Sequence, residues 1–458
     1  MRSALLLSGF MTFLALIAPS SLRAQEPGAF DRFSHVFLDA QSVRGGNGDV
    51  APAYLFAADL LQRHGFKGKL TIVVTEYDER TREGATKKSG ISILKKIVPD
   101  FERFTSRVDV TYADNVKGEP KADLFVSFAG VNGELRLPFA WSRDFESKEF
   151  RPNSPFTDKT VFFSYSVFGN TENTESTFSL STINFGKSMY VTLPPGLGEH
   201  ENGIYFDPSA ARLRDMTRTQ LRAFIQQRLG EIESAATRES IAALTSEGAQ
   251  LRVRTGFAYG ITIDEVKGQF WTYVRGIRSL ADTSPRPTVI ITPSAVNGRD
   301  LPIDLADRVE LLRKDNRLPD HLEAGKIYVL QIASVKNDMF NALMAYSELP
   351  AIVSGDNALS AAVTLGKPFV MTKVKWNAKN IEALLERLER LAVDLKIHGF
   401  ALLKEKLMKA DLSVVLDLGR FRPAFRELSA SVPMLSDRIT EVLARIEGAR
   451  NQPIPDPA

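Results

Sequence analysis

The residues best suited to chemistry form a glycine-rich stretch near the start of the chain. Gly45, Gly46 and Gly48 can adopt positive φ angles and let a ligand approach the backbone closely. Asp49 ends the stretch, with Asn47 inside it, and its carboxylate can act as a general base or cap the helix expected next. That helix would direct its free N–H groups at an anionic or hydroxyl-rich ligand. The stretch therefore indicates either a catalytic loop or a capped turn, and it lacks the G-x-G-x-x-G spacing of dinucleotide-binding folds.

A second candidate site lies within residues 349–371, LPAIVSGDNALSAAVTLGKPFVM. A buried strand is expected to end at Ser354 and Gly355, and Asp356 and Asn357 then open a short helix. This geometry directs the four residues toward the carboxyl edge of a parallel sheet, where a ribose, a phosphate or a sugar can bind. The alternative is that Asp356 or Asn357 only caps the helix.

The composition is that of an ordinary soluble protein. Of 458 residues, 44% are hydrophobic and 25% are charged, which argues against disorder and against a polytopic membrane protein. The net charge of +3 is small, so nucleic acid is not an expected partner. The lack of cysteine excludes disulfides, thiol catalysis, iron–sulfur clusters and cysteine-ligated zinc.

Residues 1–24 have the features of a secretory signal peptide. Arg2 gives a short positive region, residues 4–19 are mostly apolar, and cleavage is expected after Ala24. The apolar run is shorter than the roughly 20 residues that a spanning helix needs. We therefore expect export to the periplasm or the medium of a bacterium, with no transmembrane span after cleavage. An uncleaved signal anchor is the alternative.

Short apolar runs alternate with helical stretches along the chain, which is typical of parallel sheets covered by helices. Strands are expected at residues 35–40, 69–77, 109–113, 122–129, 253–257, 287–293, 326–333, 349–355 and 368–373. Helices are expected at residues 53–61, 210–250, 263–281, 304–313, 338–346, 358–365 and over most of 377–450. We predict an α/β fold with two doubly wound parallel-sheet lobes, residues 25–250 and 251–458, the second carrying a helical tail. Ligands would bind in the cleft between the lobes.

In these loop motifs and in the order of its expected elements, the chain resembles glycosyltransferases of the two-lobed GT-B fold. The pattern G-(D/E)-(N/D)-x₄-A-x₃-G-(K/R)-P-F, here residues 355–369, is most similar to that of bacterial protein-arginine rhamnosyltransferases. Residues 194–208, PPGLGEHENGIYFDP, and residues 256–260, GFAYG, resemble two further loops of the family. The resemblance covers most of residues 33–450.

The resemblance implies metal-independent transfer of a sugar from a nucleotide- or lipid-linked donor to an unidentified acceptor, without a cofactor. Asp49 matches the position of the family's catalytic base, and residues 45–48 would face the acceptor. Tyr259 and residues 354–357 would bind the donor. Candidates for a donor phosphate are Arg252, Arg254, Arg275 and Arg278. The motif Glu199–His200–Glu201 is more typical of a solvated turn than of a metal site.

Two features leave alternatives open. The ribose-binding glutamate of many GT-B enzymes is replaced here by Ala361 or Ala362, and a signal peptide would separate the protein from cytosolic nucleotide sugars. The chain is then either a transferase, a non-catalytic relative of this fold, or a periplasmic sugar-binding protein. The last class crosses two or three times between its lobes, whereas this chain is expected to cross once, with a return through its last helix.

Overall fold

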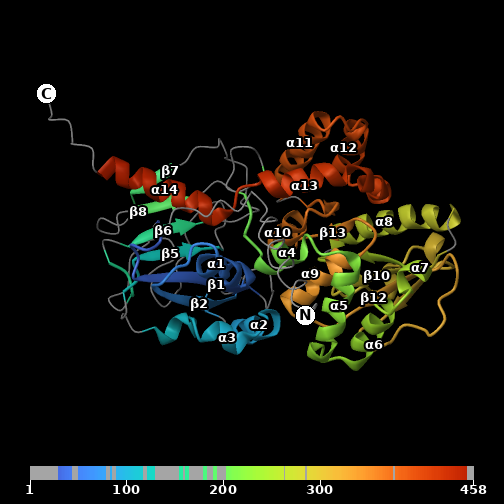
Figure 1. Ribbon diagram of the computed structural model, residues 1–458, viewed down its shortest axis with the longest axis horizontal. Coiled ribbons are helices and arrows are strands. Elements are labelled where there is room, and N and C mark those ends of the chain that lie inside the picture. Colours follow the sequence, from blue (N-terminus) through green and yellow to red (C-terminus); the bar gives the residue numbers. More distant parts are fainter. Residues whose placement is uncertain are drawn as a thin grey trace, which may run out of the picture.

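The computed structural model has two α/β lobes that lie side by side (Figure 1). The structure describes residues 29–43, 50–78, 83–84, 89–116, 121–128, 154–157, 160–164, 179–182, 189–192, 197, 203–261, 264–283, 286–374 and 377–450. The predicted signal peptide, the stretch from Gly45 to Asp49 and the motif at residues 199–201 lie outside the described residues.

The first lobe is built on one mostly parallel sheet. Its strands are β1 (His35–Val43), β2 (Lys69–Asp78), β3 (Glu83–Gly84), β4 (Val108–Tyr112), β5 (Leu124–Ser127), β6 (Val161–Ser164), β7 (Ser179–Thr182) and β8 (Met189–Thr192). Their order is β3-β2-β1-β5-β6-β8-β7, and β4 also pairs with β2. Only β3 and β7 are antiparallel to their neighbours among the described strands. Leu70, Ile72 and Val74 of β2 are buried, as is Val73 on its other face, because helices or loops cover both faces of a parallel sheet.

The second lobe contains a parallel sheet in two hydrogen-bonded parts. One part has the order β11 (Val309–Leu312), β12 (Ile327–Gln331), β10 (Thr288–Thr292) and β9 (Arg254–Phe257). The other pairs β13 (Ala351–Val353) with β14 (Phe369–Met371). A parallel bridge from Ala258 to Ile352 joins the two parts. The predicted strands of this lobe and the predicted two-lobed α/β class are confirmed.

The helix predicted at residues 304–313 is wrong. Residues Ile303–Leu305 form a single 3-10 turn, η5, and Val309–Leu312 form the edge strand β11. Arg308 and β11 bond to β12, and the side chains of Val309 and Leu312 are buried. Strand pairing within the sheet therefore overrides the local helical pattern of this short segment.

The helices cover the sheets and connect the lobes. Helices α1 (Ala51–Gln62), α2 (Gly90–Ile97) and α3 (Phe101–Thr105) belong to the first lobe. The part of the chain that leads from the first sheet to the second forms α4 (Pro208–Leu213), α5 (Arg218–Arg228), α6 (Ala235–Leu244) and α7 (Ala249–Arg252). The second lobe contains α8 (Asp264–Thr283), α9 (Asn337–Tyr346) and α10 (Asp356–Leu365), and the tail contains α11 (Ala378–Asp394), α12 (Phe400–Met408), η7 (Leu412–Phe421), α13 (Arg422–Ser431) and α14 (Leu435–Arg450). The helical stretch predicted at residues 210–250 is thus four short helices.

The chain passes between the lobes and then returns. Helices α4 and α5 pack against α9 of the second lobe. The lobe boundary predicted near residue 250 stays a prediction. The last helix, α14, lies over the first lobe in Figure 1 and packs against α1. Arg63 of α1's C-terminus is 2.7 Å from the Asp437 carboxylate of α14. No helix among the described residues is long and apolar enough to cross a membrane.

Candidate functional site

The predicted donor loop lies at the carboxyl edge of the second sheet, where the segments after β9, β10 and β13 meet. The Gly260 N–H donates to the Ser294 hydroxyl at 2.8 Å. Gly260 has a φ of +73°, and a Cβ at this position would lie 2.5 Å from the Cβ of Ser354. Only glycine therefore lets the loop after β9 lie directly against the end of β13.

Tyr259 is held beside this loop by backbone and ring contacts. Its N–H donates to the Ile352 carbonyl at 3.0 Å. Its ring packs edge-on against Phe340 of α9, with the ring centroids 5.1 Å apart. Tyr259 is half-buried, so part of the side chain stays accessible. The structure thus brings Tyr259 and Ser354 together at one edge, while their role in donor binding stays a prediction.

Helix α10 begins at this edge without a side-chain cap. Gly355 occupies the N-cap position with φ +89° and ψ 154°, and no side chain bonds there as a cap. Asp356 and Asn357 lie in the first turn and are half-buried. The alternative that one of them is the N-cap residue is therefore wrong. A carboxylate in the first turn is nevertheless favoured by the helix dipole.

The proposed acceptor loop and catalytic base, residues 45–49, lie outside the described residues. Strand β1 ends just before them and α1 begins just after them. Helix α1 packs against both α4 and α10. The element that follows the predicted base is therefore in contact with the helix that begins at the predicted donor loop.

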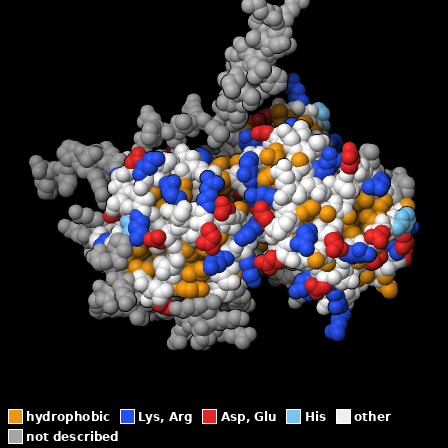
Figure 2. Space-filling model, turned by 60° about the horizontal axis from the view of Figure 1, so that its bottom comes forward, with side chains coloured by type: hydrophobic (Ala, Val, Ile, Leu, Met, Phe, Trp, Pro, Cys, Tyr) orange, Lys and Arg blue, Asp and Glu red, His pale blue; other side chains and the backbone are white. Residues whose placement is uncertain are grey.

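A cavity of about 790 Å³ lies between the two lobes. Its first-lobe wall consists of Tyr54, Ala58, Leu61, Gln62, Pro99, Asp100, Arg103, Phe104, Ser106 and Arg107. Its opposite wall lies on the second lobe, because α4 and α5 pack against α9 there although they precede residue 250. This wall consists of Pro208, Ser209, Arg212, Arg228 and Asp338. Figure 2 shows the constriction between the lobes, with basic and acidic side chains along it. None of the predicted donor residues lines this cavity; α4, which lines it, packs against α10.

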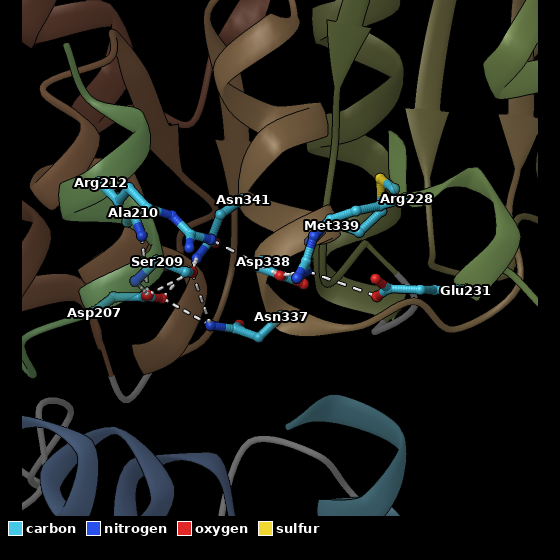
Figure 3. Close-up of polar contacts among 10 residues, drawn as sticks. All are labelled: Asp207, Ser209, Ala210, Arg212, Arg228, Glu231, Asn337, Asp338, Met339 and Asn341. Carbon is cyan, nitrogen blue, oxygen red and sulfur yellow. Dashed lines mark hydrogen bonds and ion pairs between the residues drawn. The ribbon is translucent and has the colours of Figure 1, made fainter. Parts of the chain in front are cut away.

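The charges of the cavity favour an anionic ligand. Arg103 and Arg107 come from one lobe, whereas Arg212 and Arg228 come from the other. The buried carboxylate of Asp338 forms an ion pair with Arg228 and is 4.0 Å from Arg212 (Figure 3). Four arginines thus face two carboxylates, counting Asp100, and the excess positive charge is divided between the lobes.

A buried carboxylate fixes the second-lobe wall. Asp207 caps α4 by accepting hydrogen bonds from the N–H groups of Ser209 at 2.9 Å and Ala210 at 3.1 Å. Its other oxygen accepts from the side-chain amides of Asn337 at 3.0 Å and Asn341 at 2.8 Å (Figure 3). The Ser209 hydroxyl also donates to Asp207, at 2.8 Å. Because Asn337 and Asn341 belong to α9, the Asp207 carboxylate ties the start of α4 to α9.

Sequence reasoning missed this cluster. The signals were Asp207–Pro208, which is typical of a helix start, and Asn337–Asp338 directly after β12. Their meeting required two segments about 130 residues apart to pack together. Among the described residues, no group of three or more His, Asp or Glu side chains could hold a metal ion.

The structure places three of the four predicted phosphate-binding arginines elsewhere. Arg254 is buried at the start of β9, at the opposite edge of the sheet from the donor loop. Arg275 pairs with the Asp304 carboxylate at 2.9 Å, and Arg278 donates to the Asp304 carbonyl. These three therefore do not gather at the carboxyl edge.

Comparisons with known proteins gave matches only among solved structures. No family model and no curated protein matches the chain. An alpha-glucosyltransferase in complex with UDP-glucose and DNA is 10% identical, with a TM-score of 0.39, over 90% of this chain and 99% of that one. A structure of EarP, which glycosylates arginine of translation elongation factor EF-P, is 14% identical, with a TM-score of 0.38, over 91% and 99%.

The glycosyltransferase SnogD from Streptomyces nogalater is also 14% identical, with a TM-score of 0.32, over 91% of this chain and 99% of that one. All three TM-scores lie below 0.5. The chain is similar to these glycosyltransferases over nearly its whole length, while its two-lobed α/β class rests on the sheet topology described above.

Proposed function

We propose that the protein transfers a sugar from an activated phosphate donor to an acceptor bound between its two lobes. The observation that carries this proposal is the inter-lobe cavity, which has an excess of arginine contributed by both lobes. The cavity is lined by residues of α4 and of the start of α9. Helix α4 in turn packs against α10, which begins at the donor loop. Guanidinium groups suit phosphate because they offer several hydrogen-bond donors in a fixed plane.

The proposed roles follow the positions of the residues. Tyr259 and residues 354–357 would hold the donor head group, and residues 45–48 would make room for the acceptor. A new bond would form from the acceptor to the anomeric carbon while the bond from that carbon to the donor phosphate breaks. Asp49 would take the acceptor proton, and the phosphate would leave with the bonding electron pair. Helix N-termini and arginines would stabilise its charge without a metal ion.

The residue at the position of the family's ribose-binding glutamate bears on which part of the donor the protein holds. Ala361 and Ala362 are both buried in the core, so neither can contact a ribose in the cleft. We propose that the donor is held chiefly through its phosphate and sugar. A lipid-linked donor meets this requirement as well as a nucleotide sugar does. A lipid-linked donor also suits a protein that is exported after cleavage behind Ala24.

Intact-mass analysis of exported protein tests the cleavage, and a mass that includes residues 1–24 contradicts it.

Ligand-dependent thermal stability tests the proposed function. Nucleoside diphosphates, nucleotide sugars, a polyprenyl-phosphate sugar in detergent and free sugars are compared by melting temperature. Stabilisation by a phosphate-bearing ligand, lost in Arg212→Gln, supports the proposal. Stabilisation by free sugars alone would identify a solute-binding protein, and stabilisation by none of the four would contradict a donor site.

The base is tested by Asp49→Asn. Asparagine keeps the size of the side chain and caps a helix about as well as aspartate, so the melting temperature should hardly change. Turnover should fall about 10²–10⁴-fold, the usual contribution of a general base. Full activity in this variant would contradict the assignment of Asp49. Donor binding without measurable turnover in the wild type would instead identify a non-catalytic relative.

A further inference from the structure

The inter-lobe cavity has two arginines on each wall, and the two pairs differ in their surroundings. On the second-lobe wall, Arg212 and Arg228 both approach the buried carboxylate of Asp338 (Figure 3). Their guanidinium carbons also lie over the ring of Phe224, 5.1 and 5.0 Å from its centroid. The ring and the carboxylate together orient both guanidinium groups, so this pair is suited to holding one phosphate.

The pair on the first-lobe wall, Arg103 and Arg107, lacks such neighbours. Arg103 belongs to α3 and Arg107 follows its C-terminus, and both are exposed. Within the described part of the chain, neither guanidinium group forms an ion pair or a hydrogen bond, although Asp100 lines the same wall. The carboxylate that follows them in the sequence, Asp109, is paired with Lys69 at 2.8 Å. The first lobe therefore offers the cavity charged donors that no described residue uses.

The same wall has an aromatic surface. Tyr54 of α1 and Phe104 of α3 pack edge-on, with their ring centroids 5.3 Å apart. Ala58, Leu61 and Pro99 extend the apolar part of the wall. Phe104 is half-buried and lies between the two arginines in the sequence, so a ligand on this wall meets a ring and two guanidinium groups together. This combination suits a ring-bearing molecule with an acidic substituent.

The first-lobe wall is also close to the predicted acceptor loop. Helix α1 follows residues 45–49 and begins at Ala51, and Tyr54 lies in its first turn. At the rise of an α-helix, Tyr54 is about 5 Å along the axis from the start of α1. The contact between Tyr54 and Phe104 therefore places α3 beside the amino end of α1. An acidic group bound to the arginines of α3 leaves the rest of the same molecule near the loop that contains the predicted base.

We propose that the first-lobe wall is a second anion site, where Arg103 and Arg107 hold a carboxylate or phosphate group whose ring-bearing body packs on Phe104. Naming this ligand as the acceptor rests on the proposed sugar transfer, whereas its binding does not. The donor phosphate would use Arg212 and Arg228, so an acidic acceptor and the donor phosphate would occupy opposite walls. The cavity volume of about 790 Å³ is large enough for both, since one drug-sized ligand occupies a pocket of roughly 300–1,000 Å³.

Titration calorimetry at constant ionic strength tests the two walls separately. Pyrophosphate is the probe for the second-lobe wall. Phenyl phosphate, benzoate and neutral benzyl alcohol are the probes for the first-lobe wall. We expect phenyl phosphate or benzoate to bind while pyrophosphate saturates its own site, and the one that binds identifies the acidic group. Benzyl alcohol has the ring without the charge, so it should bind at least about tenfold more weakly.

Substitutions on each wall should affect one class of probe. Arg103→Gln and Arg107→Gln should each weaken binding of the aromatic anion by about tenfold, because each removes charge-assisted donors, and should hardly change the affinity for pyrophosphate. Arg212→Gln should have the reverse effect. Arg275→Gln is the matched control, since this arginine is paired with Asp304 and does not line the cavity, and it should bind both probes as the wild type does.

The aromatic surface has a test of its own. Phe104→Leu keeps an apolar side chain but removes the ring, so it should weaken binding of phenyl phosphate more than binding of methyl phosphate. The melting temperature of each variant shows whether it is folded. Equal losses for the two phosphates would contradict packing of the ligand on Phe104.

Three further results would overturn the proposal. One is that saturating pyrophosphate abolishes binding of both phenyl phosphate and benzoate, which would mean a single site. Another is binding of these anions that is unchanged in Arg103→Gln and in Arg107→Gln. The third is equal affinity for benzyl alcohol. None of these measurements needs turnover, so sugar transfer can stand after any of them, and binding of both probes without sugar transfer would contradict the proposed function alone.

Discussion

At the scale of single residues, the most informative groups are those whose burial conflicts with their charge. Asp59 of α1 is fully buried, and burial raises its pKa to about 6, although Arg63 and the Ser436 hydroxyl, which donates to its carboxylate, act in the opposite direction. The charged form is thus disfavoured in the folded protein. The same carboxylate links α1 to α14, so its protonation affects the contact between the first lobe and the last helix.

The sign of the pH dependence follows from this shift. Between about pH 4 and pH 6 the folded protein holds a proton on Asp59 that the unfolded chain has lost, so the free energy of unfolding falls as the pH rises. The loss is on the order of 3 kcal/mol and is complete above pH 6. Asp59→Asn should remove this slope. Urea unfolding at pH 4, 5, 6 and 7 measures it, with exposed Asp315→Asn as control; an unchanged slope in Asp59→Asn contradicts the assignment.

Glycines at the donor loop give a second residue-scale prediction. Gly355→Ala meets no atom within 4 Å, but its φ of +89° is strained for any other residue, at a cost of about 1–3 kcal/mol. The backbone conformation therefore requires glycine at position 355. Gly355→Val should reduce stability as well as ligand binding, so the glycine does not serve ligand binding alone.

Gly260→Ala should cost more than Gly355→Ala, because its Cβ would also collide with Ser354. The matched control is Gly268→Ala in helix α8, which meets no atom within 4 Å and should stabilise the protein by about 0.5–1 kcal/mol. Melting temperatures of the three variants give the order. Equal stability of Gly260→Ala and Gly268→Ala would show that the loop does not lie against Ser354.

At the scale of elements, the position of α4 depends on one capping carboxylate. Asp207 bonds the first turn of α4 and two amides of α9 at once. A helix of six residues has little stability of its own, so this tie and the packing around it hold α4 between the lobes. The inter-lobe cavity depends on that position because α4 supplies part of its wall.

Asp207→Ala should lower the free energy of unfolding by about 2–4 kcal/mol, because it removes a cap and leaves buried amides unpaired. Thr217→Ala is the matched control, since Thr217 caps the more exposed helix α5; its expected cost is about 1 kcal/mol. Chemical unfolding compares the two variants. A smaller effect for Asp207→Ala than for Thr217→Ala would contradict the role of this cluster.

At the scale of the whole molecule, the two lobes are joined by both the connecting helices and the returning tail. The apolar residues Leu435, Ile439 and Leu443 recur along α14 and are all buried. Their spacing of four residues places them on one helix face. The contact of α14 with α1 shows how the C-terminal end of the chain stabilises the lobe formed by its N-terminal part.

Ile439→Ala should destabilise the protein by about 2–4 kcal/mol, because truncation of a buried side chain leaves a cavity. Ile303→Ala is the matched control, since Ile303 is 92% exposed, and it should change stability by less than about 0.5 kcal/mol. Thermal unfolding measures both variants. Similar melting temperatures would show that α14 contributes little to the fold.

The sequence alone determined most of the secondary structure and the class of the fold. Runs such as residues 69–77 predict strands because a buried parallel strand is apolar on both faces, and this pattern is local. The glycine at position 355 and the polar residues after it also indicated a strand-to-helix loop at a carboxyl edge. These features depend on neighbours in the sequence, so no contact with a distant segment had to be known.

Only the tertiary structure decided which distant residues meet. Residues 309–312 form a strand because β12 provides their hydrogen-bond partners, although their local pattern indicated a helix. Asp207 meets Asn337 and Asn341, and Lys367 lies near Arg218 and Arg422, only because separate helices and strands share an edge. Charge clusters of this kind depend on strand order and helix packing, which are properties of the whole chain and not of any one segment.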